Sequence, residues 1–550
     1  MSDATRQSSD APSLGGASDA IPYPSLALDP EGEGVFGNIE RWCDRCVSKL
    51  NPILIKEARQ SLKSRQFLIT FFCLLVASCA WTVIGVVSYA PDIYFLPSGQ
   101  DLMSGYFIIL SVSMLAFVPL VAFRSLAAEL DEGTYEMLAI TRLSAWRIVS
   151  GKMNSACLQM LIYFSAIVPC LAFCYLLRGV GLLTILLTVV LVLVTSLVLT
   201  SFALVLSTVA KGRTLQTFLL VGLVALVVFA EFTLSAFVLS EVLGERWSGT
   251  FLGYALPITM ALSFVGLFLA AAAARIAPVT ENRSTRLRAI MLGQQILWIV
   301  TIVYATWATK EIEFINLGMI MITVYWFFTG TLICGESREL SPRVLREWPS
   351  TYATKMLLSW WMPGPGTGLM FCISTALAGM IVMAGMGMFG WMAGTDIVRH
   401  NGSPPLFLVA LNAGYLFGYL GCVRLLSMPL LKRFGPSFIT PMIVALVLLF
   451  LGILVPCIFD VIFTGRVSSN YSVMHASNWF WTWGESFRRR GIQPVDVTFL
   501  ILFCGLGIMA LNLILLFREF QVERIAVPAR VEQDQQNDRS PSDSAPIEQP

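Results

Sequence analysis

The sequence predicts an all-α polytopic membrane protein with about twelve transmembrane helices. Of its 550 residues, 56% are hydrophobic and only 13% are charged, whereas about 25% of the residues in a soluble domain are charged. So little charge leaves too little polar surface to cover a chain of this length in water, which excludes an ordinary soluble enzyme. The apolar residues also form continuous runs rather than alternating ten-residue strands, which argues against a membrane β-barrel.

A helix that crosses the hydrocarbon layer needs roughly 20 mostly apolar residues. Twelve segments meet this requirement: 67–89, 103–123, 153–177, 182–209, 215–239, 251–274, 289–308, 313–334, 369–392, 406–426, 438–463 and 497–517. The division between 289–308 and 313–334 rests on the short stretch Thr309–Ile312.

The basic residues favour a topology with both termini in the cytoplasm. With the N-terminus inside, 29 of the 37 Lys and Arg residues fall in inward segments and 8 in outward loops. Cytoplasmic loops are enriched in Lys and Arg, so this split supports twelve crossings of the cell membrane. The polar segments 1–48 and 526–550 are expected to be disordered and cytoplasmic.

Residues 49–66, ahead of the first span, predict an amphipathic helix. Asn51 followed by Pro52 is typical of a helix start. Apolar and basic positions then separate onto two sides of the helix: Leu54, Ala58 and Leu62 on one, Lys56, Arg59 and Lys63 on another. Such a helix is expected to lie in the membrane interface. The alternative is a cytoplasmic extension of the first span.

The loop 124–152, between the second and third spans, predicts a short helix between two caps. Gly133 interrupts a helical run, Thr134 can cap a new helix with Glu136 near its positive end, and Ser144 caps the helix that continues into the third span. A helix of about eight residues is only marginally stable by itself. Either a partner or the chain's own helices must therefore cover it.

Two patterns in these cytoplasmic regions belong together. The loop reads Glu129-x-x-x-Gly133-Thr134-x-Glu136-x-Leu138-x-x-Thr141-x-x-Ser144-x-x-x-Ile148-x-x-Gly151-Lys152, and the segment before the first span reads Asn51-Pro52-x-x-x-Lys56-Glu57-x-x-Gln60-x-x-x-Ser64-Arg65. Both resemble the membrane subunits of type-2 ABC transporters, which are mostly exporters. With the spans that follow, the resemblance covers residues 67–275 and the helix before them.

The resemblance implies that the loop 124–152 docks on an ABC ATP-binding subunit. The residues expected at this coupling contact are Glu129, Gly133, Thr134, Glu136, Leu138 and Thr141. The chain has no Walker A sequence, since Gly151-Lys152 lacks the earlier glycine and the following Ser or Thr. We therefore expect no cofactor and no metal in this chain, with ATP bound by the partner subunit.

The segment 276–525 is expected to be a second six-span membrane module. It is either an appended module or a degenerate second copy of the first, and the charge pattern allows both. Its corresponding loop, 335–355, lacks the Glu-x-x-x-Gly-Thr pattern, which favours an appended module. The working complex is expected to pair this chain with itself or with a second permease.

Glu231 is the candidate functional residue within a span. It stands in the middle of an apolar segment without a basic residue nearby in sequence, which is costly in a membrane. The alternative is a neutral, hydrogen-bonded Glu that faces the helix bundle. The aromatic segment 478–490 is expected to anchor the chain at the membrane interface, or else to dock an outer partner.

We expect a permease subunit of an ABC transporter, of exporter type, that catalyses no reaction itself and binds no nucleic acid. An ion-coupled secondary transporter is the alternative. It would need midplane carboxylates and broken helices at matched positions in two repeats, and Glu231 has no clear counterpart. A membrane enzyme is a third hypothesis. The absence of the catalytic motifs H-E-x-x-H and G-x-S-x-G argues against it. Cys43 and Cys46 form a lone C-x-x-C, too few ligands for a zinc site.

Overall fold

The computed structural model describes residues 52–90, 97–133, 144–210, 212–243, 251–278, 282–336, 359–392, 405–435, 437–465, 471–486 and 495–519, with the single residues 343, 354 and 531. Within these ranges the regular structure is helical and contains no strand. Twelve of the described helices are long and apolar enough to cross a membrane, which confirms the predicted number of spans. The chain therefore has the character of an all-α multi-pass membrane protein.

The predicted spans all have counterparts among the helices. In the first half these are α3 (Arg65–Tyr89), then α4 (Gly99–Ser111), η2 (Val112–Phe117) and α5 (Val118–Asp131) in one continuous span, α7 (Ala145–Leu176), α8 (Leu182–Val209), α9 (Arg213–Phe237) with η3 (Val238–Val242), and α10 (Phe251–Ile276). In the second half they are α11 (Ser284–Thr309), α12 (Glu313–Ile333), α15 (Pro365–Met392), α16 (Pro405–Phe434), α17 (Ile439–Thr464) and α19 (Val495–Glu519). Shorter elements are α2 (Pro52–Leu62), η4 (Ser359–Trp361), η6 (Val473–Ser477) and α18 (Trp479–Ser486).

Helix α2 is a separate helix and not an extension of the first span. Ser64 lies between α2 and α3 and has an extended backbone. Its hydroxyl caps α3 by accepting a 3.2 Å hydrogen bond from the Phe67 N–H. Helix α2 turns away to pack against α7, where the Ser61 and Ser155 hydroxyls are 3.2 Å apart. The alternative of a continuous extension is therefore wrong.

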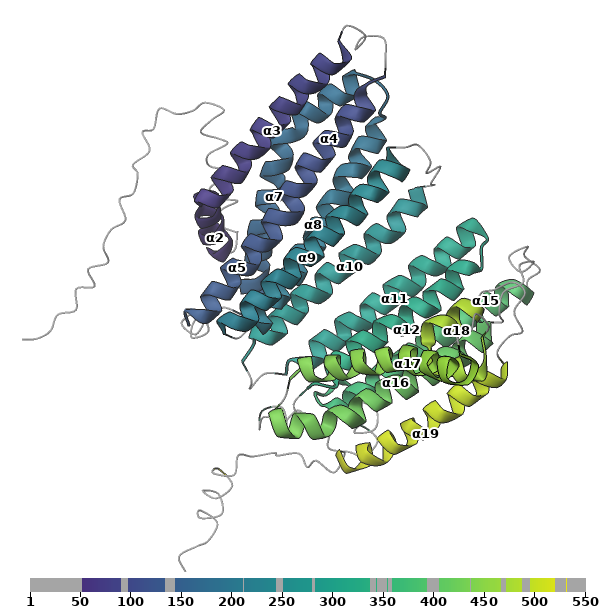
Figure 1. Cartoon of the computed structure of the whole chain (residues 1–550). Helices are drawn as coiled ribbons and strands as arrows, with labels where there is room; N and C mark the ends of the chain where they lie inside the picture. Colours follow the sequence, from purple (N-terminus) through teal and green to yellow (C-terminus); the bar gives the residue numbers. More distant parts are fainter. Residues whose placement is uncertain are drawn as a thin grey trace, which may run out of the picture.

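The two halves pack their six spans in the same pairs. In the first half, the second span contacts α3, α7, α8 and α9, and α10 contacts α7 and α8. In the second half, α12 contacts α11, α15, α16 and α17, and α19 contacts α15 and α16. Three further pairs of spans are in contact in both halves: the first with the third, the third with the fourth, and the fourth with the fifth. Both halves thus share one helix arrangement, and α10 lies beside α11 where they meet (Figure 1).

Close packing in the second half depends on small residues. A Cβ atom at Gly414 of α16 would lie 2.9 Å from backbone atoms of Leu502 in α19, so this glycine permits a close helix approach. The same helix buries Arg424, whose Nη1 is 3.2 Å from both the carbonyl and the side-chain oxygen of Asn512. Helices α16 and α19 are therefore tied by both packing and hydrogen bonds.

Two tryptophans of the aromatic segment after α17 pack inward, whereas Phe480 between them is 57% exposed. Trp479 and Trp483 of α18 are only 4% and 8% exposed. Trp479 stacks on Tyr415 of α16 with ring centroids 5.2 Å apart, and the Trp483 indole N–H donates a 2.8 Å hydrogen bond to Asn412. The polar N–H groups of buried indoles need such partners, and α16 supplies this one.

Candidate functional site

Lys152 lies in a buried ionic cluster at a point where three helices meet. Its ammonium nitrogen is 3.0 Å from Oε1 of Glu129 in α5 and 3.3 Å from Oε2 of Glu57 in α2. It also donates a 2.9 Å hydrogen bond to the Ser125 hydroxyl. Only 3% of the Lys152 side chain is exposed. We call Glu57, Ser125, Glu129 and Lys152 the Lys152 cluster; it joins α2, the end of α5 and the start of α7.

The cluster is stabilising only while it is complete. Removing one partner of a buried ion pair typically costs about 3–5 kcal/mol, because the remaining charge stays buried without its counterion. The side chains of Glu57 and Glu129 are 10% and 19% exposed, so water screens their attraction to Lys152 only in part. The three helix ends are therefore held in a fixed relation to one another.

The predicted helix boundaries on either side of the loop are confirmed, although Ser144 makes no side-chain capping hydrogen bond and the predicted cap Thr134 lies outside the described residues. Helix α5 ends at Asp131, and Gly133 follows with a φ of 68°. Glycine is the usual residue in this left-handed conformation after a helix. A Cβ atom at Gly133 would meet nothing within 4 Å, so it is the backbone conformation, and not crowding, that favours glycine there. At the other end, Ser144 is extended and α7 begins at Ala145.

The structure places only part of the expected coupling contact. Glu129 and Gly133 are described, whereas Thr134, Glu136, Leu138 and Thr141 lie outside the described residues. Glu129 pairs with Lys152 of its own chain. Its carboxylate therefore holds the base of the loop, a role that the sequence did not reveal.

Glu231 lies on the packed face of α9. The buried residues of α9 and η3 are Leu223, Val227, Val238 and Val242, and their three- or four-residue spacing places position 231 on the same face. The other side of the helix is strongly exposed, for example Phe232 at 73%. Glu231 therefore faces the helix bundle.

The Glu231 carboxyl group is partly satisfied by hydroxyl groups. Ser111, at the end of α4, donates a 2.5 Å hydrogen bond to Oε1, and Ser235 donates to the same oxygen at 3.5 Å. The other oxygen, Oε2, is buried and has no hydrogen-bond partner among the described residues. This geometry matches the interpretation of a hydrogen-bonded Glu facing the bundle, and a transport role would use Oε2.

Two π-helical turns flank the Glu231 contact. The turn η2 begins directly after Ser111, and η3 continues α9. A π turn displaces backbone groups from their usual partners and is frequent at functional sites. In η2 the Met114 carbonyl accepts a 2.8 Å hydrogen bond from Ser196 of α8, and at the end of η3 the Leu243 carbonyl accepts one from the Gln100 amide. The second and fifth spans therefore form a second candidate region.

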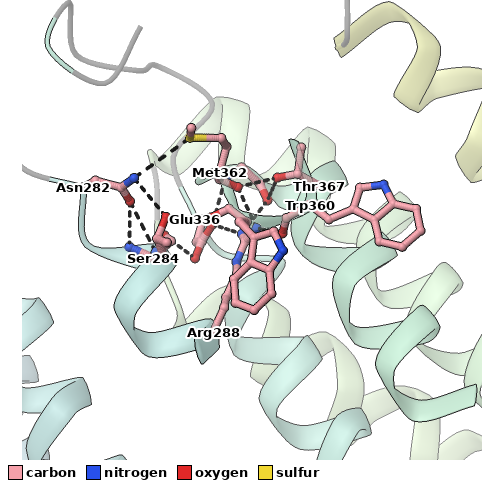
Figure 2. A network of polar contacts seen from close by, with 10 residues as sticks. Asn282, Ser284, Arg288, Glu336, Trp360, Met362 and Thr367 are labelled. Atoms are coloured by element: carbon pink, nitrogen blue, oxygen red, sulfur yellow. Dashed lines mark hydrogen bonds and ion pairs between the residues drawn. The ribbon is translucent and has the colours of Figure 1, made fainter. Parts of the chain in front are cut away.

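A second buried ionic cluster lies at the corresponding corner of the second half (Figure 2). Arg288, near the start of α11, donates a 2.8 Å hydrogen bond to Oε2 of Glu336, which lies just after α12. It also donates at 2.6 Å to the carbonyls of Trp360 and Met362, which lie just before α15. Ser284 donates at 2.8 Å to the other Glu336 oxygen. This Arg288 cluster joins the ends of α11, α12 and α15.

Sequence reasoning missed both clusters. Glu57, Glu129 and Lys152 all stand in the two patterns quoted for the resemblance, and that shared membership was a signal of a common site. Arg288 and Glu336 carried no such signal, since each is one of several charged residues beside an apolar segment. No group of three or more His, Cys, Asp or Glu residues that could hold a metal ion occurs in the described part of the chain. Cys43 and Cys46 lie outside it.

The Lys152→Met variant tests the stabilising role of the Lys152 cluster. It keeps the length of the side chain but leaves the carboxylates of Glu57 and Glu129 without their cation, so we expect a loss of about 3 kcal/mol or more in stability. The measurement is the midpoint of thermal unfolding in detergent. The control is Lys432→Met, at the exposed end of α16, which should unfold like the wild type. Equal midpoints for Lys152→Met and the control would show that the cluster does not stabilise the fold.

The Glu231→Gln variant separates folding from function at the second region. The amide oxygen can still accept the Ser111 hydrogen bond, so membrane insertion and thermal unfolding should stay close to wild type, within about 0.5 kcal/mol. Glu231→Leu, which removes the acceptor, should lower the unfolding midpoint. A transport defect in a stable Glu231→Gln variant would then report function. If Glu231→Gln failed to accumulate in the membrane, that result would contradict the hydrogen-bonding account.

Comparisons with protein-family models, with curated proteins and with solved structures found no match to this chain.

Proposed function

We propose that the chain is the membrane-spanning permease subunit of an ABC transporter, of the exporter type, driven by a separate ATP-binding subunit. The observation that carries the proposal is the Lys152 cluster. It brings together Glu57, Glu129 and Lys152, three of the charged residues of the two patterns that resemble type-2 permeases. These patterns are far apart in the chain and meet at the base of one loop.

The cluster gives the loop a mechanical connection to the spans. Residues 134–143 are bounded by α5 and α7, and the ends of both helices are tied through Lys152 to each other and to α2. A force applied to the loop by a partner would therefore move three helices together. This is the property that a permease needs if ATP is hydrolysed in another chain.

The packing of the second half favours a degenerate second copy over an appended module. Its spans repeat the pairings of the first half, and the Arg288 cluster stands at the corner that corresponds to the Lys152 cluster. The two clusters use different residues to neutralise their buried cation. This difference accounts for the absence of the Glu-x-x-x-Gly-Thr pattern from the loop 335–355. We propose that both halves descend from one six-span permease module.

An ion-coupled secondary transporter remains the second candidate, because each fifth span carries an acid. Glu231 stands in α9, and Asp460 stands in α17, the counterpart of α9 by its packing. Asp460 is 5% exposed and lies 2.9 Å from Nε2 of His475. Asp460 is thus a counterpart of Glu231 that was not expected from the sequence, although it lies near the end of α17 and not at mid-span.

Purification of the full chain from its native membranes tests the proposal. An ATP-binding protein should co-purify with the wild type. Gly133→Pro, which cannot adopt a positive φ, and Glu136→Arg should each reduce the recovery of that protein about tenfold, or about 1.4 kcal/mol of binding, while the chain itself still inserts. The matched control is Gly465→Pro, since Gly465 also follows a helix with a φ of 72° and open space around it.

The control variant should retain the ATP-binding protein. If none co-purifies with the wild type, or if both loop variants retain it fully, the secondary-transporter candidate moves to first place.

A further inference from the structure

A groove of about 330 Å³ lies between α3, α5 and α7. Its apolar lining includes Ile69 of α3, Phe117 at the end of η2, and Val121 of α5. Its polar lining includes Arg124 of α5 and Gln159 of α7. Arg124 directly precedes Ser125, so the polar end of the groove adjoins the Lys152 cluster.

Gln159 is the clearest sign that the groove takes a ligand. Its side chain is 6% exposed, yet it has no hydrogen-bond partner among the described residues. One turn further along α7, Tyr163 also lines the groove, but its hydroxyl lies 2.6 Å from the Thr70 hydroxyl. The amide is not among the fully buried polar atoms that lack a partner, so it is open to the groove that the residue lines. A bound molecule with oxygen acceptors would satisfy it.

The polar end of the groove carries uncompensated positive charge. Arg124 is exposed and forms no ion pair with any described residue. Lys63 and Arg65 flank Ser64, which lines the groove, and neither of them forms an ion pair within the described ranges. An anion rich in oxygen acceptors is complementary to this end.

The apolar end of the groove requires more than an anion. Ile69 and Phe117 are 62% and 42% exposed. Phe117 and Arg124 are seven residues apart on one continuous helical span, roughly 10 Å along its axis. The ligand therefore combines an anionic head with an alkyl chain at least that long.

We propose that the groove binds one anionic phospholipid. Arg124 and Gln159 bind its phosphate oxygens, and one acyl chain lies along Phe117, Val121 and Ile69. Basic pockets between transmembrane helices recognise acidic lipid headgroups in this way. The bound lipid contacts α3, α5 and α7 and so stabilises the same helices that the Lys152 cluster joins. The proposal does not depend on the ATP-binding partner.

Native mass spectrometry of the purified, delipidated full chain tests the proposal. We expect one phosphatidylglycerol molecule to bind at least about tenfold more tightly than phosphatidylcholine with the same acyl chains. Arg124→Gln and Gln159→Glu should each weaken phosphatidylglycerol binding about tenfold, the first by removing the cation and the second by repelling the phosphate. Arg213→Gln, at the exposed start of α9 outside the groove, should bind like the wild type.

Thermal unfolding checks that each variant is folded, and if Arg124→Gln does not fold, Gln159→Glu decides alone. Glycerol phosphate is the probe for a free phosphate source, and it should not compete with phosphatidylglycerol. Equal binding of the two lipids, wild-type binding by the folded groove variants, or effective competition by glycerol phosphate would each overturn the lipid assignment.

Discussion

A charged side chain inside a hydrocarbon layer must find its counterion or its hydrogen-bond partners within the protein, because the layer offers neither water nor salt. This chain meets the constraint in three ways. Lys152 is neutralised by two carboxylates and Arg288 by one carboxylate with backbone carbonyls, whereas Arg424 donates hydrogen bonds to the oxygens of Asn512. Each solution ties together helices that are distant in sequence. The positions of the helix ends follow from where these cations are buried.

The Lys152 and Arg288 clusters make the corner where the second span of each half ends and the third begins the most informative region for function. Each cluster joins the end of the second span of its half to the start of the third span. It therefore lies at the base of the segment that connects these two spans. Hydrocarbon packing alone would let these helices slide, since lipid chains are as apolar as the side chains that face them. Buried ion pairs fix the register instead. The connecting segments are thus attached to a rigid corner.

The features predicted from sequence are those that depend on local residues. Run length located the twelve spans, Pro52 marked the start of α2, and Gly133 and Ser144 marked the ends of the helices around the loop. These signals are contained in a few neighbouring residues, so one sequence suffices to read them.

The features that were missed depend on contacts between distant segments. Glu336 is 48 residues from Arg288, and Ser111 is 120 residues from Glu231, so no local pattern could pair them. The π turns η2 and η3 interrupt long apolar runs without any change in composition. The aromatic segment around Trp479 was assigned to the interface because composition alone cannot distinguish a membrane anchor from rings that pack against another helix.

The central claim is that the loop after Gly133 contacts an ATP-binding subunit. The most direct measurement places a photo-crosslinking amino acid at Glu132, the exposed residue that follows α5, and irradiates native membranes. The account predicts a covalent adduct between this chain and an ATP-binding protein, and no such adduct when the same amino acid replaces Val473, an exposed residue of η6. Adducts from position 132 only to lipid or to the chain itself would contradict it.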